Sequence, residues 1–263
     1  MKDLGEMHMI RMIVLDLDGT LLNSKGEISE ENTKVLKQIS KKCAIVLASA
    51  RGFYRIKEYY LKLGLSKGDN FAIAYNGGVI VDKDLNYCFE MFIENNPVEK
   101  IVDYLLCESF GRIVLYTEHN SIELSKLDDI KGFIECNKIF KVVFLAEEDL
   151  IRECREDLSE SKFKDYFEIT SSELTRIEFV PKGITKVNAI ARIAQYLNIN
   201  QSEVVAIGDG ENDIEMIKYA GYGVAMGNAT EIVKKNANII TDTNDNDGVA
   251  KVLVKLKEQK LID

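Results

Sequence analysis

Hydrophobic and polar residues follow a strand and helix pattern along the first third of the chain. Residues 10–15 are almost wholly apolar, which predicts a strand buried on both faces in a parallel sheet. Ser29 precedes two acidic residues and an apolar stripe at helical spacing, so we expect a helix to begin there. Apolar runs at 43–47 and 71–75, separated by an amphipathic segment at 56–63, continue the alternation. This order is typical of a parallel sheet with helices on its faces.

The pattern changes between residues 83 and 181. Asn96-Pro97 opens a helix, and a second helix is expected from about Glu147. Short strands without regular helical crossovers indicate an α+β region with antiparallel pairing. Pro181-Lys182-Gly183, at its end, is suited to a hinge. The strands are expected at 113–117, 121–124, 141–145, 167–170 and 175–180.

The alternation of predicted helices and strands returns after residue 181. A helix is predicted over 187–197 and a buried strand over 204–207, and further strands and a final helix follow. The expected fold class is therefore α/β, with a doubly wound, Rossmann-like parallel-sheet core. We assign residues 1–82 and 182–263 to this core, and residues 83–181 to an inserted α+β domain.

Composition and charge disfavour several classes of function. In this 263-residue chain the uncharged apolar runs fall far short of the roughly 20 residues needed to cross a membrane. A formal net charge of −9 without a basic run disfavours nucleic acid and anionic membrane as partners. Five scattered cysteines suit reduced thiols, and the first eleven residues show no secretory signal. We expect a cytoplasmic protein that is a monomer or a weak homodimer.

Polar side chains follow four of the predicted strands. The carboxyl ends of parallel strands meet at one edge of the sheet, where open α/β sheets bind ligands. Asp16 and Asp18 end the first strand and would point to the same side if the strand stayed extended. Taken alone, an Asp-x-Asp sequence is most often only a solvated turn. The other side chains expected at this edge are Ser49, Arg51, Asn76, Asp209, Asn212 and Asp213, with Lys186 at the start of a nearby helix.

Carboxylates gathered without cationic partners repel one another, and a divalent cation is the simplest way to hold them together. The two histidines lie in polar segments and do not form a ligand cluster. Because the available ligands are oxygens, Mg²⁺ is favoured over zinc as the cofactor. The candidate metal-binding residues are Asp16, Asp18, Asp209 and Asp213.

The motifs resemble those of a known superfamily. Asp16-Leu17-Asp18-Gly19-Thr20, Ser49, Lys186 and Gly208-Asp209-x-x-Asn212-Asp213 occur in the order of the four motifs of the haloacid dehalogenase superfamily. Asn76-Gly77, the large insertion and residues 223–229 resemble its Cof-like branch of sugar-phosphate phosphatases, which carry a class IIB-type cap domain. The resemblance covers nearly the whole chain after residue 9.

This resemblance implies a role for each motif residue. Asp16 would attack phosphorus to form an aspartyl-phosphate, and Asp18 would protonate the leaving oxygen and later deprotonate the attacking water. Mg²⁺ would be held by the carboxylates of Asp16 and Asp209 and by the backbone carbonyl of Asp18. The residues that would bind phosphoryl oxygens are Ser49, Lys186 and Asn212. The inserted domain would be a cap that selects the leaving group.

Some assignments leave alternatives open. Asp213 either orients the metal ligands or is a helix N-terminal charge, and Arg51 either contacts substrate or pairs with an acidic neighbour. Ala50 and Asn188 stand where this branch usually has Gly, which affects the fine shape of the phosphate pocket. The predicted activity is hydrolysis of small phosphorylated metabolites, with sugar phosphates favoured. The alternatives are a sugar phosphomutase and a non-catalytic protein that binds phosphorylated metabolites.

Overall fold

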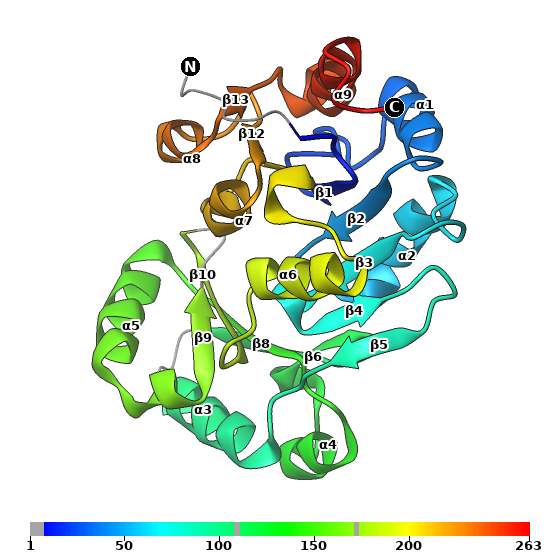
Figure 1. Cartoon of the computed structure of the whole chain (residues 1–263). Helices are drawn as coiled ribbons and strands as arrows, with labels where there is room; N and C mark the ends of the chain where they lie inside the picture. The colour runs from blue at the N-terminus through cyan, green and yellow to red at the C-terminus, as the bar shows by residue number, and fades with distance from the viewer. Residues whose placement is uncertain (1–7, 108–110, 171–173) are drawn as a thin grey trace.

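The structure, a computed structural model, describes residues 8–107, 111–170 and 174–263. These residues form an eight-stranded sheet and a five-stranded sheet, each covered by helices (Figure 1). The larger sheet belongs to the core domain and the smaller one to the inserted cap domain, which lies at the lower left in Figure 1. The expected α/β core with an inserted α+β cap is therefore confirmed.

The core sheet runs through β13 (Ile239–Ile240), β12 (Tyr222–Ala225), β11 (Val204–Gly208), β1 (Met12–Asp16), β2 (Ala44–Ala48), β3 (Phe71–Ala74), β4 (Val79–Val81) and β5 (Tyr87–Glu90). Neighbouring strands pair in parallel from β13 to β3, and β4 and β5 continue the sheet in antiparallel pairing. The order of the chain reverses between β1 and β11. Open α/β sheets bind ligands at such a switch point, outside the carboxyl ends of the strands.

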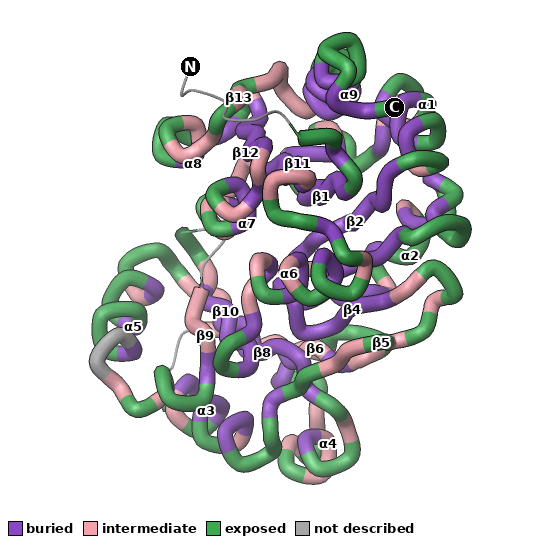
Figure 2. Tube along the Cα trace, viewed as in Figure 1, coloured by how far each residue is buried: buried purple, intermediate pink, exposed green. Residues whose placement is uncertain are grey.

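Helices cover both faces of the core sheet. One face packs against α1 (Glu30–Ile39), α2 (Phe53–Lys62) and α9 (Gly248–Glu258), and the other against α6 (Lys186–Tyr196) and α7 (Ile214–Tyr219). α8 (Glu231–Asn236) packs beside α7 and β12. Figure 2 shows the result, with buried strands at the centre and helices whose outer sides are exposed.

Side chains of β1 alternate between these two faces. Ile13 and Leu15 join the apolar cluster that includes α1 and α9, whereas Val14 joins the cluster that includes α6. Since the side-chain period of a strand is two residues, the side chain of Asp16 points to the same face of the sheet as that of Val14. Its carboxylate therefore faces the side of the sheet on which α6 begins with Lys186.

The cap sheet runs through β7 (Ser121–Glu123), β6 (Arg112–Tyr116), β8 (Lys141–Leu145), β10 (Arg176–Pro181) and β9 (Phe167–Thr170), all antiparallel. α3 (Asn95–Cys107), α4 (Ile130–Cys136) and α5 (Glu148–Glu160) pack on one face, where alternate residues such as Val142, Phe144 and Phe179 are buried. The intervening residues lie on the opposite face, which is turned toward the core domain.

The structure departs from the predicted elements at short segments. The helices α4, α7 and α8 have seven, six and six residues, which is too short for hydrophobic periodicity to indicate them. β5 is hydrogen-bonded to β4 in the core sheet although it follows residue 82, the predicted end of the first core segment. The limits of the two domains stay a prediction.

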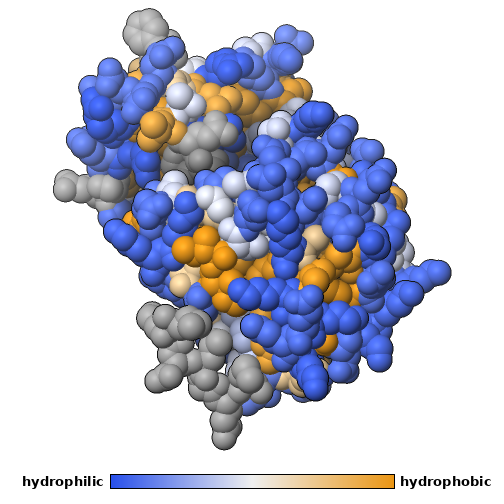
Figure 3. Space-filling model, turned by 90° about the horizontal axis from the view of Figure 1, so that it is seen from above, coloured by the Kyte–Doolittle hydropathy of each residue, from blue (hydrophilic) through white to orange (hydrophobic). Residues whose placement is uncertain are grey.

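None of the described helices is long and apolar enough to cross a bilayer. The face seen in Figure 3 is mostly hydrophilic, with hydrophobic residues in separate groups.

Packing of α6 on the core sheet can be tested with a cavity-forming substitution. Ile190 is fully buried in α6, so Ile190→Ala should lower the free energy of unfolding by about 2 to 5 kcal/mol. Ile232 in α8 is 50% exposed, and the matched change Ile232→Ala should cost less than about 0.5 kcal/mol. Urea unfolding followed by circular dichroism measures both values, and equal losses would contradict the assigned packing.

Candidate active site

Lys186 lies at the first position of α6 and contacts two carboxylates. Its side chain is 3% exposed, and Nζ donates to Asp16 Oδ1 at 2.6 Å and to Asp213 Oδ1 at 2.7 Å. Burial alone would lower the pKa of Lys186, but the two carboxylates hold it above its ordinary value. The ammonium group is therefore charged at neutral pH, even though a helix N-terminus disfavours a cation.

The loop after β11 brings Asp209 to the same place. Thr20 Oγ1 donates to Asp209 Oδ1 at 2.7 Å. Asp213 Oδ2 accepts from the backbone N–H groups of Asp209 and Gly210, at 3.1 and 3.0 Å. The Asp213 carboxylate therefore holds both this loop and the ammonium group of Lys186. Carboxylate oxygens of Asp16, Asp209 and Asp213 all lie within 4.8 Å of one another, a spacing that could hold a metal ion.

Negative charge is in excess within this cluster, because three carboxylates share one ammonium group. Burial raises the pKa of Asp16 well above its ordinary value, and Asp213 adds to the effect while Lys186 opposes it. Burial also raises the pKa of Asp209, to about 6, although the hydrogen bond from Thr20 acts against this. A hard divalent cation would relieve the repulsion, and the all-oxygen donor set fits Mg²⁺.

Gly19 allows the first loop to approach Asp209 closely. Its φ is +78°, and a Cβ at this position would lie 2.3 Å from Asp209 Oδ2. The side chain of Asn228 holds the same loop, because its Nδ2 donates to the Gly19 carbonyl at 2.8 Å. Only glycine satisfies both the backbone conformation and the space available.

Ser49 is oriented by the loops that follow β2 and β3. Its residue is 1% exposed, and its hydroxyl accepts from the N–H of Arg51 at 3.1 Å. The N–H of Asn76 donates to the Ser49 carbonyl, and that of Tyr75 to the Arg51 carbonyl, both at 3.0 Å. Tyr75 and Asn76 have φ of 53° and 57°, which non-glycine residues seldom adopt. The two loops therefore hold each other in a strained conformation.

Asp18 and Arg51 form a two-pronged ion pair at the mouth of the site. Arg51 Nε donates to Asp18 Oδ2 at 2.8 Å, and its second nitrogen contacts Oδ1. Arg51 thus pairs with an acidic neighbour, one of the two interpretations left open by the sequence. The extended strand ends at Asp16, so the condition for Asp16 and Asp18 to share one side is not met. Asp18 has a side chain 57% exposed, whereas Asp16 is buried.

Most of the predicted site residues line one cavity of about 490 Å³. The adjoining cavity of about 250 Å³ is lined by Asn76, Lys186 and Asn212, so Asn76 contributes backbone support to Ser49 without lining the larger cavity. The predicted residues that do line the larger cavity are Asp16, Asp18, Ser49, Ala50, Arg51, Asp209, Asn212 and Asp213.

Five charged or phenolic residues that the sequence reasoning did not name also line this cavity. Tyr116, Lys141, Arg176 and Glu178 come from the cap sheet, and Arg55 comes from α2. Lys141 begins an otherwise apolar strand, and Glu178 lies between apolar residues of its strand. Charged residues at such positions could have been noticed in the sequence. The direction in which they face depends on how the cap packs against the core.

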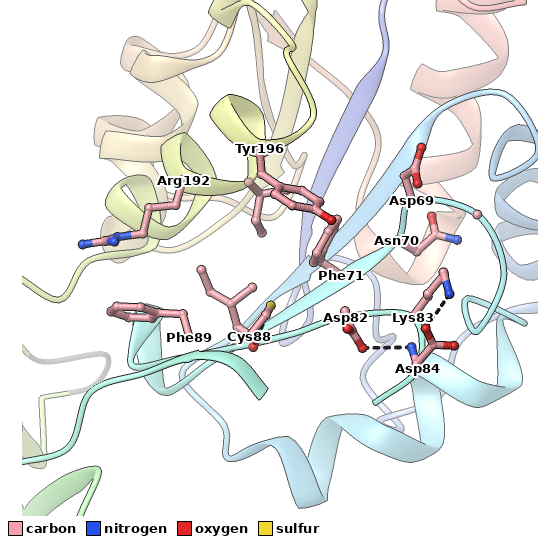
Figure 4. A pocket seen from close by; sticks show the side chains of 13 residues that line it. Asp69, Asn70, Phe71, Asp82, Lys83, Asp84, Cys88, Phe89, Arg192 and Tyr196 are labelled. Atoms are coloured by element: carbon pink, nitrogen blue, oxygen red, sulfur yellow. Dashed lines mark hydrogen bonds and ion pairs between the residues drawn. The ribbon is translucent and has the colours of Figure 1, made fainter. Parts of the chain in front are cut away.

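A second cavity of about 490 Å³ lies elsewhere, so volume alone does not identify the site. Figure 4 shows Phe71, Phe89 and Tyr196 around it, with Asp69 and Asp82 nearby. This cavity is near the beginning of β3 and the end of α6. The acidic cluster lies at the other edge of the core sheet, where its parallel strands end. None of the motif residues lines it.

A doubly wound core, an acidic cluster at its switch point and an inserted cap together define a capped, Rossmann-like α/β protein. The chain belongs to the haloacid dehalogenase-like hydrolase family, whose model matches residues 13–253. The chain is a phosphatase of this family, since relatives that match it over more than nine tenths of both chains are named as phosphatases.

Relatives agree with this assignment over most of the chain. A 5-amino-6-(5-phospho-D-ribitylamino)uracil phosphatase of Bacillus subtilis is 36% identical, covering 93% of this chain and 94% of its own. The structure of a haloacid dehalogenase-like hydrolase from Bacteroides thetaiotaomicron has a TM-score of 0.82 at 32% identity, covering 94% and 99% of the two chains. A HAD subclass IIB sugar phosphatase has a TM-score of 0.75 at 21% identity, covering 96% and 100%, and supports the fold alone.

The close approach of Gly19 to Asp209 predicts a local effect on metal binding. Gly19→Ala should displace the Asp209 carboxylate and weaken Mg²⁺ binding by at least about tenfold in calorimetric titration. Gly26 is the matched control, because it has a similar φ of +75° but nothing within 4 Å of the added Cβ. Gly26→Ala should cost stability without changing Mg²⁺ affinity, and similar affinities for both variants would contradict the expected geometry.

The raised pKa of Asp209 predicts how metal affinity depends on pH. A carboxylate must lose its proton to bind Mg²⁺, and the pKa of Asp209 lies at about 6. The apparent Mg²⁺ affinity should therefore rise by at least about tenfold from pH 5 to pH 7. Calorimetry in buffers of matched ionic strength tests this, and an affinity that stays constant from pH 5 to pH 7 would refute it.

Proposed function

We propose that the chain is a Mg²⁺-dependent phosphatase of small phosphorylated metabolites, with sugar phosphates as the favoured class. The observation that carries the proposal is the cluster of buried Asp16 and Lys186 with half-buried Asp209 at the switch point of the core sheet. Mg²⁺, when bound by the carboxylates of Asp16 and Asp209 and the carbonyl of Asp18, would neutralise charge on the phosphoryl oxygens. Asp213 would orient these ligands through its bonds to the Asp209 loop.

Asp16 is the proposed nucleophile. Its carboxylate attacks phosphorus, the ester oxygen leaves, and water then cleaves the aspartyl-phosphate. Lys186 bonds one oxygen of this carboxylate and so fixes its orientation at the floor of the cavity. Lys186, Ser49 and Asn212 would bind phosphoryl oxygens, since all three lie beside the acidic cluster.

Asp18 is the proposed general acid and base. It stands at the mouth of the cavity, where a leaving oxygen would emerge, and gives its proton to that oxygen before taking one from the water. The ion pair with Arg51 occupies both carboxylate oxygens of Asp18. Substrate would therefore have to exchange this pair for a contact of Arg51 with the ester before the Asp18 carboxyl group can contact the leaving oxygen.

The leaving group is proposed to lie between the core and the cap of residues 83–181. This placement supports a small metabolite as substrate, because the cap sheet closes one side of the cavity with polar residues. The relative from Bacillus subtilis is named for a ribitylaminouracil phosphate, so that ester belongs in a substrate screen with hexose, pentose and triose phosphates. We also propose that the protein is cytoplasmic and has no nucleic acid or membrane partner.

Replacing the nucleophile tests the mechanism. Asp16→Asn should reduce hydrolysis of 4-nitrophenyl phosphate in Mg²⁺ by at least about 10³-fold, because an amide cannot form the aspartyl-phosphate. Asp149→Asn is the matched control, since Asp149 is 83% exposed on α5 and pairs only with nearby Arg152 among the ion pairs of the described residues. The control should retain activity within about twofold.

Three outcomes would contradict the proposal. An inactive wild type would favour a protein that only binds phosphorylated metabolites, and an active Asp16→Asn variant would exclude the covalent route. Isomerised sugar phosphate in place of released phosphate, measured by phosphorus NMR, would support the phosphomutase alternative.

A further inference from the structure

Lys141 and Glu178 form a buried ion pair in the cap, on the side of the active-site cavity. Lys141 Nζ lies 3.2 Å from Glu178 Oε2, and the side chains are 5% and 2% exposed. Lys141 also lies over the ring of Tyr116, 4.7 Å from its centroid. All three residues line the cavity that contains Asp16 and Ser49.

Alternation along the cap strands explains why these side chains face the cavity. Val142 and Phe144 of β8 and Phe179 of β10 point to the cap helices and form the apolar core of the cap. Lys141 and Glu178 occupy the opposite parity, so they lie on the sheet face that is turned to the core domain. Their contact with the core is direct, because Lys141 Nζ donates to the Ala50 carbonyl at 3.0 Å.

Stability of the cap does not account for this pair. Removing two charges from water is expensive, and replacing a buried ion pair with apolar residues of similar volume is often neutral or stabilising. The cap already has a separate apolar core on the other face of its sheet. A buried lysine and glutamate that face the substrate cavity are therefore better explained by recognition.

Donor and acceptor stand side by side in this pair, which matches a hydroxylated ligand. An ammonium group has three N–H donors, and two of those of Lys141 are used by Ala50 and Glu178. A carboxylate accepts at about four positions, so Glu178 can accept from a hydroxyl in addition to its contacts with Lys141 and with Arg176, whose Nη1 lies 3.8 Å from Oε1. A hydroxyl group both donates and accepts, and can contact the two side chains at once.

The rest of the cap wall favours the same chemistry. The cap contributes Tyr116, Lys141, Arg176 and Glu178 to the cavity, and among the described residues it contributes no aliphatic side chain. Hydrogen bonds to charged groups are stronger than neutral ones, and they discriminate against a ligand that lacks the hydroxyl. An apolar leaving group would leave these buried polar groups without a partner.

We propose that Lys141 and Glu178 bind hydroxyl groups of the leaving group and thereby select polyhydroxylated phosphate esters, such as sugar and sugar-alcohol phosphates. This inference rests on the proposed phosphatase function and assigns substrate selection to two named cap residues. The alternative is a purely positional role, in which Lys141 acts only by holding the Ala50 carbonyl beside Ser49.

The test compares two esters in one set of variants. The hydroxylated ester is the sugar or pentitol phosphate that the wild type hydrolyses fastest, and the reference is 4-nitrophenyl phosphate, which carries no hydroxyl. Glu178→Gln should reduce kcat/KM for the hydroxylated ester by at least about tenfold, mainly through KM, because the charged acceptor is lost. The value for the reference ester should fall much less, so the ratio of the two changes.

Two further variants guard against misfolding and nonspecific effects. Lys141→Met combined with Glu178→Leu removes both charges, so it should keep its melting temperature while losing the preference for the hydroxylated ester. Glu123→Gln is the matched control, since Glu123 lies in the cap sheet, pairs with Arg112 at 3.7 Å and does not line the cavity. It should keep the wild-type ratio.

Each outcome decides between the two roles. A loss of preference in Glu178→Gln and in the double variant supports hydroxyl recognition, whereas an equal loss for both esters, or no loss, overturns it. A wild type that hydrolyses neither 4-nitrophenyl phosphate nor any of the sugar and pentitol phosphates would overturn the phosphatase function instead. Binding of 4-nitrophenyl phosphate and of these sugar and pentitol phosphates would then be compared by calorimetry, where equal affinities for the wild type would overturn hydroxyl recognition separately.

Discussion

The ammonium group of Lys186 lies between the carboxylates of Asp16 and Asp213, and the rest of the site depends on this arrangement. It joins the end of β1, the start of α6 and the loop after β11, which are far apart in the sequence. Each buried charge is tolerable only because the others are present. The remaining negative charge is what makes a divalent cation the natural further partner of Asp16, Asp209 and Asp213.

Around this centre, the loops after β1, β2 and β3 are held in place mainly by hydrogen bonds and close contacts with other loops. Thr20 and Gly19 hold the first loop against Asp209, and the loops after β2 and β3 exchange backbone hydrogen bonds around Ser49. Tyr75 extends this network to the cap, because its hydroxyl donates to the Thr117 carbonyl at 2.6 Å and its ring stacks on Phe140. The loop that carries Ser49 is thus connected to the cap through Tyr75.

A division of chemistry between the domains follows from this geometry. The core supplies the acidic cluster and the groups proposed to act on the phosphoryl group, whereas the cap supplies a polar wall that includes Lys141 and Glu178. Because the two sets of residues come from different sheets, the leaving-group side can change without disturbing the acidic cluster.

The sequence alone determined the fold class, the strands that carry the motifs and most residues of the cavity, because apolar periodicity and strand-end chemistry are local properties. It did not determine the short helices α4, α7 and α8, which span fewer than about two turns. Only the tertiary structure decided that Asp18 pairs with Arg51 and that Lys141 and Glu178 face the cavity. These contacts join segments separated by 33 or more residues, and their partners are set by packing of whole sheets.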